Sequence, residues 1–319
     1  MPEIEQELKQ INPIIMNNIK PTKGKLGEAL QYTFSTTGKQ LRPALALEFG
    51  QLEKSQLNKK LLNIAASIEV LHNATLIHDD IIDESPRRHG KTSIQKKYGK
   101  QIAVYAGDYL FALSLQLLSG NTSKITNLRM NSNAMRNILA GETAQFGNEF
   151  NIKITERDYL NQIKGKTAIL FGYSCFIGAL EGGLSRKQAK IAEKIGENIG
   201  MAFQLKDDVL DYTSKSDILN KPVLADIVNG IYTGPLIFAL KNDENDNLLN
   251  LVQKGKKINK TDLSQINHLV QKYGGIKSTE ALANQYTNKA LHLLKNDFDQ
   301  YQRSKNIEWI INKLFIRNY

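Results

Sequence analysis

The feature that most constrains this sequence is the pattern Asp-Asp-x-x-Asp, which occurs twice, each time at the end of a long and largely apolar stretch. The two triplets are Asp79, Asp80 and Asp83, and Asp207, Asp208 and Asp211. The stretches 61–77 and 191–210 have the length and composition of buried helices. Residues three and four apart share one face of a helix, so each triplet predicts a cluster of carboxylates at a helix end.

Such a cluster is unfavourable unless a cation compensates it. Like charges at this spacing repel each other, and the C-terminal end of a helix is itself slightly negative. A hard cation that prefers oxygen ligands removes the conflict, and Mg²⁺ shared with a phosphate is the usual case. A single copy could be only a solvated or turn-forming run. Two copies predict metal-binding clusters that face each other across the mouth of a cavity.

Cationic residues stand close to these clusters in the sequence. The loop 86–92 follows the first triplet and contains two arginines and a lysine. Lys39 and Arg42 stand near the start of another predicted helix, where free N–H groups favour anions. Cations beside metal-binding carboxylates suit a bound diphosphate, because both can share its charge.

The predicted helix over 158–180 is interrupted by Lys-Gly-Lys-Thr at 164–167. The glycine and the small polar residues predict a kink that turns Lys166 and Thr167 inward. The triplet Gly-Lys-Thr is not a P-loop, because that motif would need glycine where Leu160 stands and a strand before it.

The other predicted elements are also helices. They cover 4–15, 26–34, 102–118, 125–146, 235–241, 260–273, 277–296 and 304–316. The period-two alternation of strands does not extend over any length, and no linker, low-complexity tract or repeat divides the chain. The sequence therefore predicts an all-α fold, with one domain over 1–319 built as a helical bundle around a deep central cavity.

Composition narrows the classes of function. The 319 residues are 41% hydrophobic and 23% charged, and no uninterrupted apolar run has the roughly 18 residues of a membrane span. The polar N-terminus is unlike a signal or transit peptide, and the single cysteine, Cys175, excludes a disulfide framework within the chain. We expect a cytoplasmic protein. The net charge of +10 carries no nucleic-acid signature, so we expect no nucleic-acid partner.

Further motifs stand in a fixed order around the two triplets. They are Gly38-Lys39-x-x-Arg42-Pro43, Glu69-x-x-His72, His78-Asp79-Asp80-x-x-Asp83, Tyr105-x-Gly107-Asp108, Gly141-Glu142-x-x-Gln145, Lys166-Thr167-Ala168, Phe203-Gln204-Leu205-x-Asp207-Asp208-x-x-Asp211 and Lys221-Pro222. This set resembles the trans-isoprenyl diphosphate synthases, or polyprenyl synthetases. A class I terpene cyclase shares the first cluster, but its second motif follows a different Asn/Asp-Ser/Thr-Glu pattern.

The resemblance implies an isoprenoid-synthase-type fold and a chain-elongating prenyltransferase. Several Mg²⁺ ions would grip the diphosphate of an allylic substrate, farnesyl or geranyl diphosphate. Its ionisation would leave an allylic cation, to which isopentenyl diphosphate adds before a proton is lost. Such chemistry needs stabilisation of the leaving group and positioning rather than a nucleophilic triad.

The resemblance also implies roles for individual residues. The metal ligands would be Asp79, Asp80, Asp83, Asp207, Asp208 and Asp211. The allylic diphosphate would be bound by Arg88, Lys166, Gln204 and Lys221. Isopentenyl diphosphate would be bound by Lys39, Arg42, His72 and His89. Catalysis would rest on Asp79, Asp80, Asp83, Lys166, Thr167, Asp207 and Asp208.

Two positions depart from the family pattern. His89 stands where the second arginine of Arg-Arg-Gly is usual, so either His89 binds as a cation or Arg87 and Arg88 take over. Asn220 stands before Lys221 where glycine is usual.

The residues before the first triplet predict the length of the product. In the family, the positions four and five before the first aspartate form the floor of the product cavity, and short-chain synthases often place an aromatic residue there. Here these positions hold Thr75 and Ala74, with Leu71 one turn further as the next floor. The resemblance therefore implies a medium or long all-trans product, hexaprenyl or heptaprenyl diphosphate.

Within the family the chain is most similar to the catalytic large subunits of bacterial two-component hexa- and heptaprenyl diphosphate synthases, which make the menaquinone side chain. This implies a second, non-catalytic subunit and contact with a membrane surface for product release. The alternatives are a self-sufficient homodimeric polyprenyl or geranylgeranyl diphosphate synthase and, from another class, a non-catalytic helical partner subunit.

Overall fold

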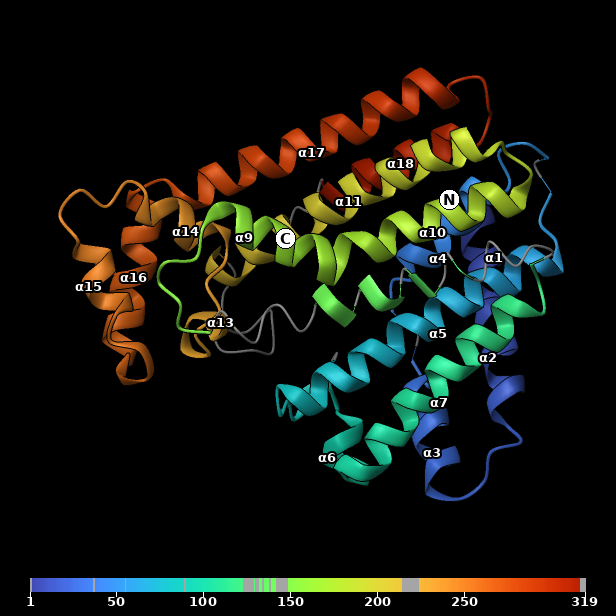
Figure 1. Ribbon diagram of the computed structural model, residues 1–319, viewed down its shortest axis with the longest axis horizontal. Helices are drawn as coiled ribbons and strands as arrows, with labels where there is room; N and C mark the ends of the chain where they lie inside the picture. Colours follow the sequence, from blue (N-terminus) through green and yellow to red (C-terminus); the bar gives the residue numbers. More distant parts are fainter. Residues whose placement is uncertain are drawn as a thin grey trace. The chain divides into compact units, whose positions relative to one another are not determined.

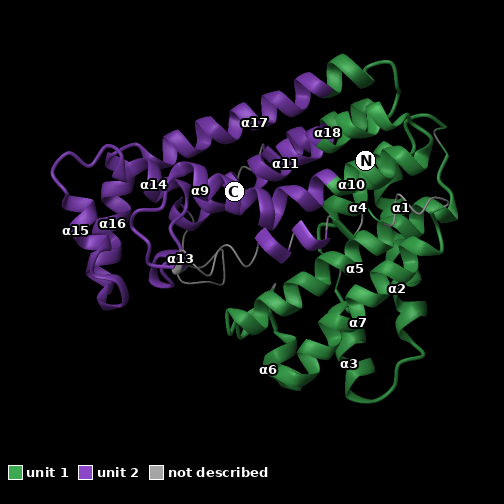
Figure 2. Ribbon diagram, in the orientation of Figure 1, with its two compact units in different colours: residues 1–133, 173–193, 294–308 green, residues 134–172, 194–293, 309–319 purple. Residues whose placement is uncertain are grey.

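The chain has an all-α fold, as predicted (Figure 1). The computed structural model describes residues 2–36, 38–54, 56–88, 90–122, 129, 132–133, 135–137, 139–141, 149–213 and 224–315. Contacts group the chain into two compact units, coloured separately in Figure 2. Unit 1 is Met1–Asn133, Tyr173–Glu193 and Leu294–Glu308, and unit 2 is Ala134–Gly172, Lys194–Leu293 and Trp309–Tyr319. The predicted single domain and its central cavity stay predictions.

Unit 1 begins with a series of helices and one short hairpin. Its elements are α1 (Pro2–Lys9), α2 (Ile11–Ile19), α3 (Gly24–Thr33), α4 (Leu41–Gly50), α5 (Lys59–Ile82), β1 (Arg87–Arg88), β2 (Lys91–Thr92), α6 (Ile94–Tyr98) and α7 (Lys100–Ser119). Four later helices contain the boundaries between the units. They are α10 (Ile169–Gly182), α11 (Arg186–Thr213), α17 (Gly275–Phe298) and α18 (Ser304–Phe315).

The N-terminal helix predicted over 4–15 is in fact two helices, α1 and α2, separated at Gln10. Pro13 explains the break, because a proline ring inside a helix clashes with the carbonyl group four residues earlier, here that of Lys9. The apolar pattern still holds, since Ile11 and Ile15 are fully buried. The prediction was therefore correct about the buried face and wrong about continuity.

The core of unit 1 lies between α2, α3, α5 and α7. Side chains of α5 and α7 pack along each other, and Ser67 and Ser114 join the two helices by a buried hydroxyl contact of 3.2 Å. By length and composition alone, α7 could cross a membrane, and 44% of its apolar window is buried inside the structure. A core helix of a soluble protein passes the same test, and the packing on α5 agrees with that reading.

Unit 2 consists of shorter helices together with parts of the long ones. Its own elements are α9 (Glu156–Ile163), η1 (Lys164–Ala168), α13 (Ala225–Val228), α14 (Gly234–Leu240), α15 (Asn247–Val252), η2 (Gly255–Lys257) and α16 (Lys260–Lys272). Capping boxes begin two of these helices, Thr155 with Asp158 at α9 and Asn259 with Asp262 at α16. The helix predicted over 125–146 lies mostly outside the described residues.

A buried ion cluster joins the two ends of unit 1. Arg303, in the turn before α18, donates to Glu3 and Glu7 of α1 over 2.9 Å each and to Glu48 of α4 over 3.3 Å. Asn306 donates to both carboxylate oxygens of Glu48. Burial raises the pKa of Glu48 to about 7, although Arg303 and Asn306 oppose the shift. The guanidinium therefore compensates three carboxylates contributed by distant parts of the sequence.

We predict that Arg303→Met destabilises the protein strongly. Removing one partner of a buried ion pair leaves uncompensated charge, which costs about 3 kcal/mol or more in the free energy of unfolding. Urea denaturation measures the change. Arg186→Met, at an exposed arginine of α11, is the control and should change the free energy by less than about 0.5 kcal/mol. Equal stability of the two variants would contradict the role assigned to the cluster.

Candidate active site

The first aspartate cluster lies at the end of α5. Asn58 caps the start of this helix by accepting a hydrogen bond from the N–H of Leu61 (3.0 Å), and the helix ends at Ile82. Asp79 is half-buried, and Asp83, which directly follows the helix, is exposed. The N–H of Asp83 donates to the carbonyl oxygen of Asp79 (2.8 Å). The structure thus brings the first triplet together at a helix end, as its spacing predicts.

Asp80 differs from its neighbours because it is buried, with 4% of its surface exposed. Arg88 of β1 holds it: Nε donates to Oδ1 over 2.8 Å, and a terminal nitrogen lies 2.6 Å from the same oxygen. The strand carrying Arg88 pairs antiparallel with β2 (Arg88 opposite Lys91), and Gly90, with φ of +77°, lies in the turn between them. Arg88, which is predicted to bind the diphosphate, therefore contacts the carboxylate of Asp80 in the first cluster. His89 lies outside the described residues.

Two of the residues predicted to bind isopentenyl diphosphate contact each other. Arg42, in the first turn of α4, lies with one terminal nitrogen 3.2 Å from Nε2 of His72 on α5. A guanidinium can only donate, so this imidazole nitrogen accepts and the ring proton lies on Nδ1. Burial lowers the pKa of Arg42 to about 10, against the opposing charge of Glu69, so Arg42 remains a cation at neutral pH. Lys39 is exposed just before α4.

Gly107 of α7 makes room for the imidazole of His78, the residue that precedes the first cluster. A Cβ atom on Gly107 would overlap the ring of His78. Nε2 of that ring lies 3.4 Å from the carbonyl oxygen of Val104 and 3.5 Å from Oδ1 of Asp108. The Gly-Asp pair of α7 therefore fixes the side chain next to the cluster.

The second cluster occupies the last two turns of α11. Asp207 is exposed and Asp211 half-buried, whereas Asp208 is only 5% exposed. Tyr159 of α9 donates to Oδ2 of Asp208 (2.5 Å), and Nε2 of Gln204 donates to Oδ1 (2.9 Å). Burial raises the pKa of Asp208 to about 7, although these two hydrogen bonds oppose the shift. In both clusters, then, the second aspartate is buried and its carboxylate is held by other side chains.

The predicted interruption of the helix over 158–180 is a single π-helical turn, η1. The N–H of Ile169 donates to the carbonyl oxygen of Lys164, five residues earlier. Thr167 is buried in this turn, and its Oγ1 donates to Oε1 of Gln204 (2.7 Å). Lys166 is half-buried beside it. The wide turn thus places Thr167 against the helix that carries the second cluster.

Glycines allow two other segments to approach the π turn closely. A Cβ atom on Gly200 of α11 would lie 2.5 Å from Cα of Ala168, and one on Gly165 would lie 2.5 Å from Cα of Gly141. Gly200 thus allows α11 to pack closely on the π turn. Any side chain at these two positions would push α11 or residue 141 away from η1.

The predicted site residues fall into two sets. Unit 1 contains Asp79, Asp80, Asp83, Lys39, Arg42, His72 and Arg88, and unit 2 contains Asp207, Asp208, Asp211, Lys166, Thr167 and Gln204. Lys221, like His89, Glu142 and Gln145, lies outside the described residues. That the two clusters face each other across a cavity stays a prediction.

The three residues predicted to control product length lie in neighbouring turns of α5. Leu71 stands three before Ala74 and four before Thr75, and Thr75 stands four before Asp79. All three predicted residues are buried. That they form the floor of the product cavity stays a prediction.

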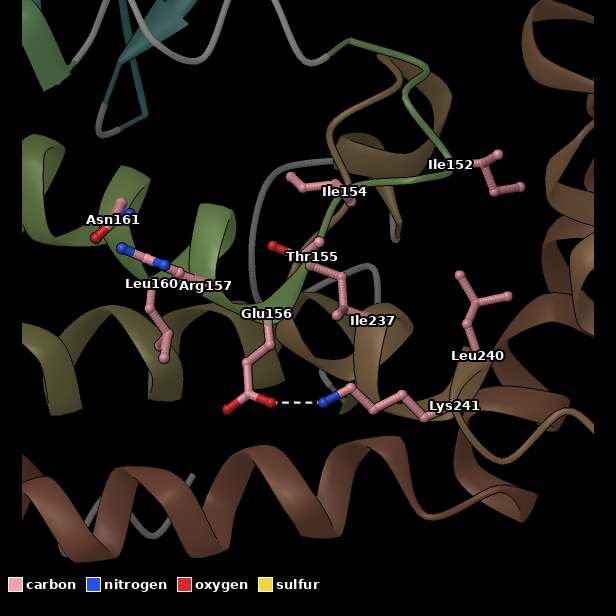
Figure 3. A pocket seen from close by; sticks show the side chains of 10 residues that line it. All are labelled: Ile152, Ile154, Thr155, Glu156, Arg157, Leu160, Asn161, Ile237, Leu240 and Lys241. Carbon is pink, nitrogen blue, oxygen red and sulfur yellow. Dashed lines mark hydrogen bonds and ion pairs between the residues drawn. The ribbon is translucent and has the colours of Figure 1, made fainter.

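A pocket of about 730 Å³ lies in unit 2 along α9 and α14 (Figure 3). Its walls combine apolar side chains, such as Leu160 and Leu240, with the ion pair of Glu156 and Lys241 (2.5 Å). Among the predicted site residues that the structure describes, none lines this pocket. It is therefore distinct from both aspartate clusters.

The acidic residues fit a hard cation that is shared with a phosphate. Among the residues that the structure describes, no three His, Cys, Asp or Glu side chains are placed to hold a metal ion by themselves. The second aspartate of each cluster is bonded to protein side chains. The other carboxylates, Asp79 and Asp83 at one helix end and Asp207 and Asp211 at the other, offer the oxygen donors that Mg²⁺ prefers, with phosphate oxygens supplying the remaining ligands.

Comparison with known proteins identifies the family. The sequence matches the family model described as Polyprenyl synthetase over residues 23–270. The chain belongs to the polyprenyl synthetase family. It is therefore a prenyltransferase of the trans-polyprenyl diphosphate synthase type, as the resemblance implied.

Individual relatives agree with this assignment. The chain is 33% identical over 291 residues to heptaprenyl diphosphate synthase component 2 of Bacillus subtilis (strain 168), covering 91% of this chain and 80% of that protein. It is similar in structure to the heptaprenyl diphosphate synthase of Staphylococcus aureus, with a TM-score of 0.93, 29% identity and 99% of both chains covered. It is also similar to the Caulobacter crescentus CB15 polyprenyl synthase solved with calcium and isoprenyl diphosphate (TM-score 0.91, 27% identity, 99% and 96% covered).

Sequence reasoning missed Tyr159, which contacts a predicted site residue, Asp208. Its hydroxyl contacts the second cluster, yet it stands in the sequence well before that motif and carries no charge at neutral pH. The available signal was weak: Tyr159 is a large amphipathic residue on the apolar face of the helix that leads into the π turn.

We predict that Gly107→Ala lowers prenyltransferase activity. The added methyl group displaces the imidazole of His78 next to the first cluster, and a misplacement of about 1 Å can cost on the order of 100-fold in rate. Steady-state assays and thermal unfolding measure the effect. Gly120→Ala is the control, because its Cβ would meet only Gln116 O at an ordinary 3.5 Å. If Gly107→Ala were as active as Gly120→Ala, the spacing role of Gly107 would be refuted.

Proposed function

We propose that this chain condenses isopentenyl diphosphate with an allylic diphosphate, farnesyl or geranyl diphosphate, to give all-trans hexaprenyl or heptaprenyl diphosphate. The observation that carries the proposal is a repeated pair of carboxylates in a chain of this family. Each pair is spaced four residues apart near the end of a helix: Asp79 and Asp83 at the end of α5, and Asp207 and Asp211 on α11. Two such pairs suit one polyanionic leaving group.

The chain's own residues would bind and ionise the allylic substrate. Mg²⁺, when bound, would neutralise the charge that develops on the leaving diphosphate. The six aspartates of the two clusters are the proposed ligands, with Arg88, Lys166, Gln204 and Lys221 as contacts of the same diphosphate. The C–O bond breaks and the diphosphate leaves with the electron pair. The hydroxyl of Thr167 and the half-buried Lys166 would lie beside the allylic cation.

The second substrate would be held by residues at the start of α4 and on α5. Arg42 carries its charge at neutral pH, and the neutral His72 contacts it directly. Lys39 and His89 complete the proposed set for isopentenyl diphosphate. The double bond of this substrate attacks the allylic cation, a new C–C bond forms, and the proton lost in the last step passes to the released diphosphate.

The length of the product would be set along α5 by Thr75 and Ala74, with Leu71 one turn further from Asp79. Each added isoprene unit moves the growing chain away from the cluster, toward the N-terminal end of this helix. Thr75 is small enough to let the chain pass, and Leu71 stands one turn further. A medium or long product follows.

We predict that Thr75→Phe shortens the product. A phenyl ring one turn from Asp79 would close that path, and chain-length analysis of dephosphorylated products measures the change. Ala74→Phe is the second test, because position 74 belongs to the same predicted floor, and it should also shorten the product. A ring at either buried position costs about 1–3 kcal/mol of stability, so thermal unfolding is measured alongside. An unchanged product distribution in both variants would exclude these positions as the floor.

We further propose a cytoplasmic, two-component enzyme for the menaquinone side chain, with peripheral membrane contact at product release. The support is the name of the Bacillus subtilis relative, which is component 2 of a heptaprenyl diphosphate synthase. The remaining alternative is a homodimer that needs no second subunit.

The test supplies the purified chain with Mg²⁺, radiolabelled isopentenyl diphosphate and farnesyl diphosphate. Hexa- or heptaprenyl product from the chain alone would establish a self-sufficient enzyme. Product that forms only after extract of the source cells is added would establish a second subunit. No product from isopentenyl diphosphate under either condition would refute the proposed reaction.

We predict that Asp79→Ala abolishes this turnover, with a loss of at least about 100-fold, while the chain stays folded. Asp299→Ala, at an exposed aspartate after α17, is the control and should retain full activity. Retained activity in Asp79→Ala would remove the first cluster from the mechanism. Circular dichroism and size-exclusion chromatography check that folding and assembly are intact.

A further inference from the structure

Four side chains of unit 2 form an unbroken line of hydrogen bonds. Tyr159 Oη donates to Asp208 Oδ2 (2.5 Å), Gln204 Nε2 donates to Asp208 Oδ1 (2.9 Å), and Thr167 Oγ1 donates to Gln204 Oε1 (2.7 Å). The line begins on α9, crosses α11 and ends in the π turn. It therefore links Tyr159 to Thr167, which stand eight positions apart in the sequence.

The hydrogen bonds keep one direction along the line. Nε2 of Gln204 donates to Asp208, so the amide oxygen of Gln204 faces Thr167 and accepts from its hydroxyl. The proton of the Thr167 hydroxyl is then committed to Gln204. The lone pairs of that hydroxyl then face away from Gln204. They would present the negative end of the hydroxyl dipole to the proposed allylic cation.

Tyr159 is held so firmly that it can anchor this line. It is 1% exposed, and it lies in the first turn of α9, which the capping box of Thr155 and Asp158 fixes. Gly234, at the start of α14, lies against its hydroxyl, and a Cβ atom there would stand 3.0 Å from the oxygen. Burial together with the charge of Asp208 keeps the pKa of Tyr159 well above its ordinary value, so the phenol stays a donor.

We propose that Tyr159 is a positioning residue of the prenyl transfer, which orients the Thr167 hydroxyl through Asp208 and Gln204. The inference rests on the proposed function, because Thr167 is placed beside the cation only there. Without the phenol, one oxygen of Asp208 loses its donor. The carboxylate can then rotate and release Gln204, and the Thr167 hydroxyl is free to point its proton toward the cation.

Tyr159→Phe tests the proposal, because it removes only the hydroxyl. We expect kcat to fall about tenfold while KM for isopentenyl diphosphate changes less than about threefold, since the proposed site for that substrate lies on α4 and α5. Tyr173→Phe is the matched control: its phenol is also buried, with no hydrogen-bond partner in the part of the chain described, and it should behave as wild type.

Double substitution separates positioning from a general structural role. In a Gln204→Leu background the line is already broken, so adding Tyr159→Phe should change kcat by less than about twofold. Full additivity of the two losses would overturn the proposal, as would wild-type kcat in Tyr159→Phe. A loss confined to KM for isopentenyl diphosphate would also overturn it.

A measurement that needs no turnover tests the role of Tyr159 independently of the proposed reaction. In protein labelled with ¹⁵N-glutamine, the side-chain NH₂ signals of Gln204, assigned by their loss in Gln204→Leu, should be protected from solvent exchange. Protection should persist in Tyr173→Phe and disappear in Tyr159→Phe. Persistence in Tyr159→Phe would refute the anchoring role. A wild type that makes no prenyl product, with this exchange pattern intact, would refute only the proposed function.

Discussion

The repulsion between neighbouring carboxylates at a helix end is the constraint on which this site depends. Each cluster places two aspartates side by side, and each buries the second of the pair. A buried charge is tolerated only when hydrogen bonds or an opposite charge compensate it. For Asp80 the compensation is Arg88, and for Asp208 it is Tyr159 with Gln204. The first aspartate of each pair is left half-buried or exposed, where it can meet a ligand.

The two solutions differ in their electrostatic result. A guanidinium cancels the charge that it holds, so the Arg88 contact lowers the total negative charge of the first cluster. The donors that hold Asp208 are neutral, so they stabilise its carboxylate without cancelling its charge, and burial raises its pKa to about 7. Two aspartates at equivalent positions of the same motif are therefore held by different chemistry.

Much of this arrangement could be predicted because it is local in sequence. The spacing of Asp79 and Asp83 places them on one face of a helix. The glycine before Lys166 predicts the interruption of the helix that contains both residues. The rest depends on contacts between distant segments. Tyr159 matters only because α9 packs on α11, and no charge or motif marks it. Thr75 and Ala74 were predicted from their distance to Asp79, and only packing shows that both are buried. The family was predictable, since its motifs are local.

The π turn has a consequence for how this chain can vary. A π turn holds one residue more than an α turn, so it is equivalent to an insertion accommodated without breaking the helix. Losing one residue between Lys164 and Ala168 would restore α-helical geometry with little net rotation of α10 relative to α9, because the π turn already holds the extra residue. A residue lost between Tyr159 and Lys164, outside the π turn, would instead rotate the following side chains by about 100°. Tyr159 and Thr167 would then no longer meet the same face of α11. The π turn is therefore the place between α9 and α10 where a change of length is tolerated best.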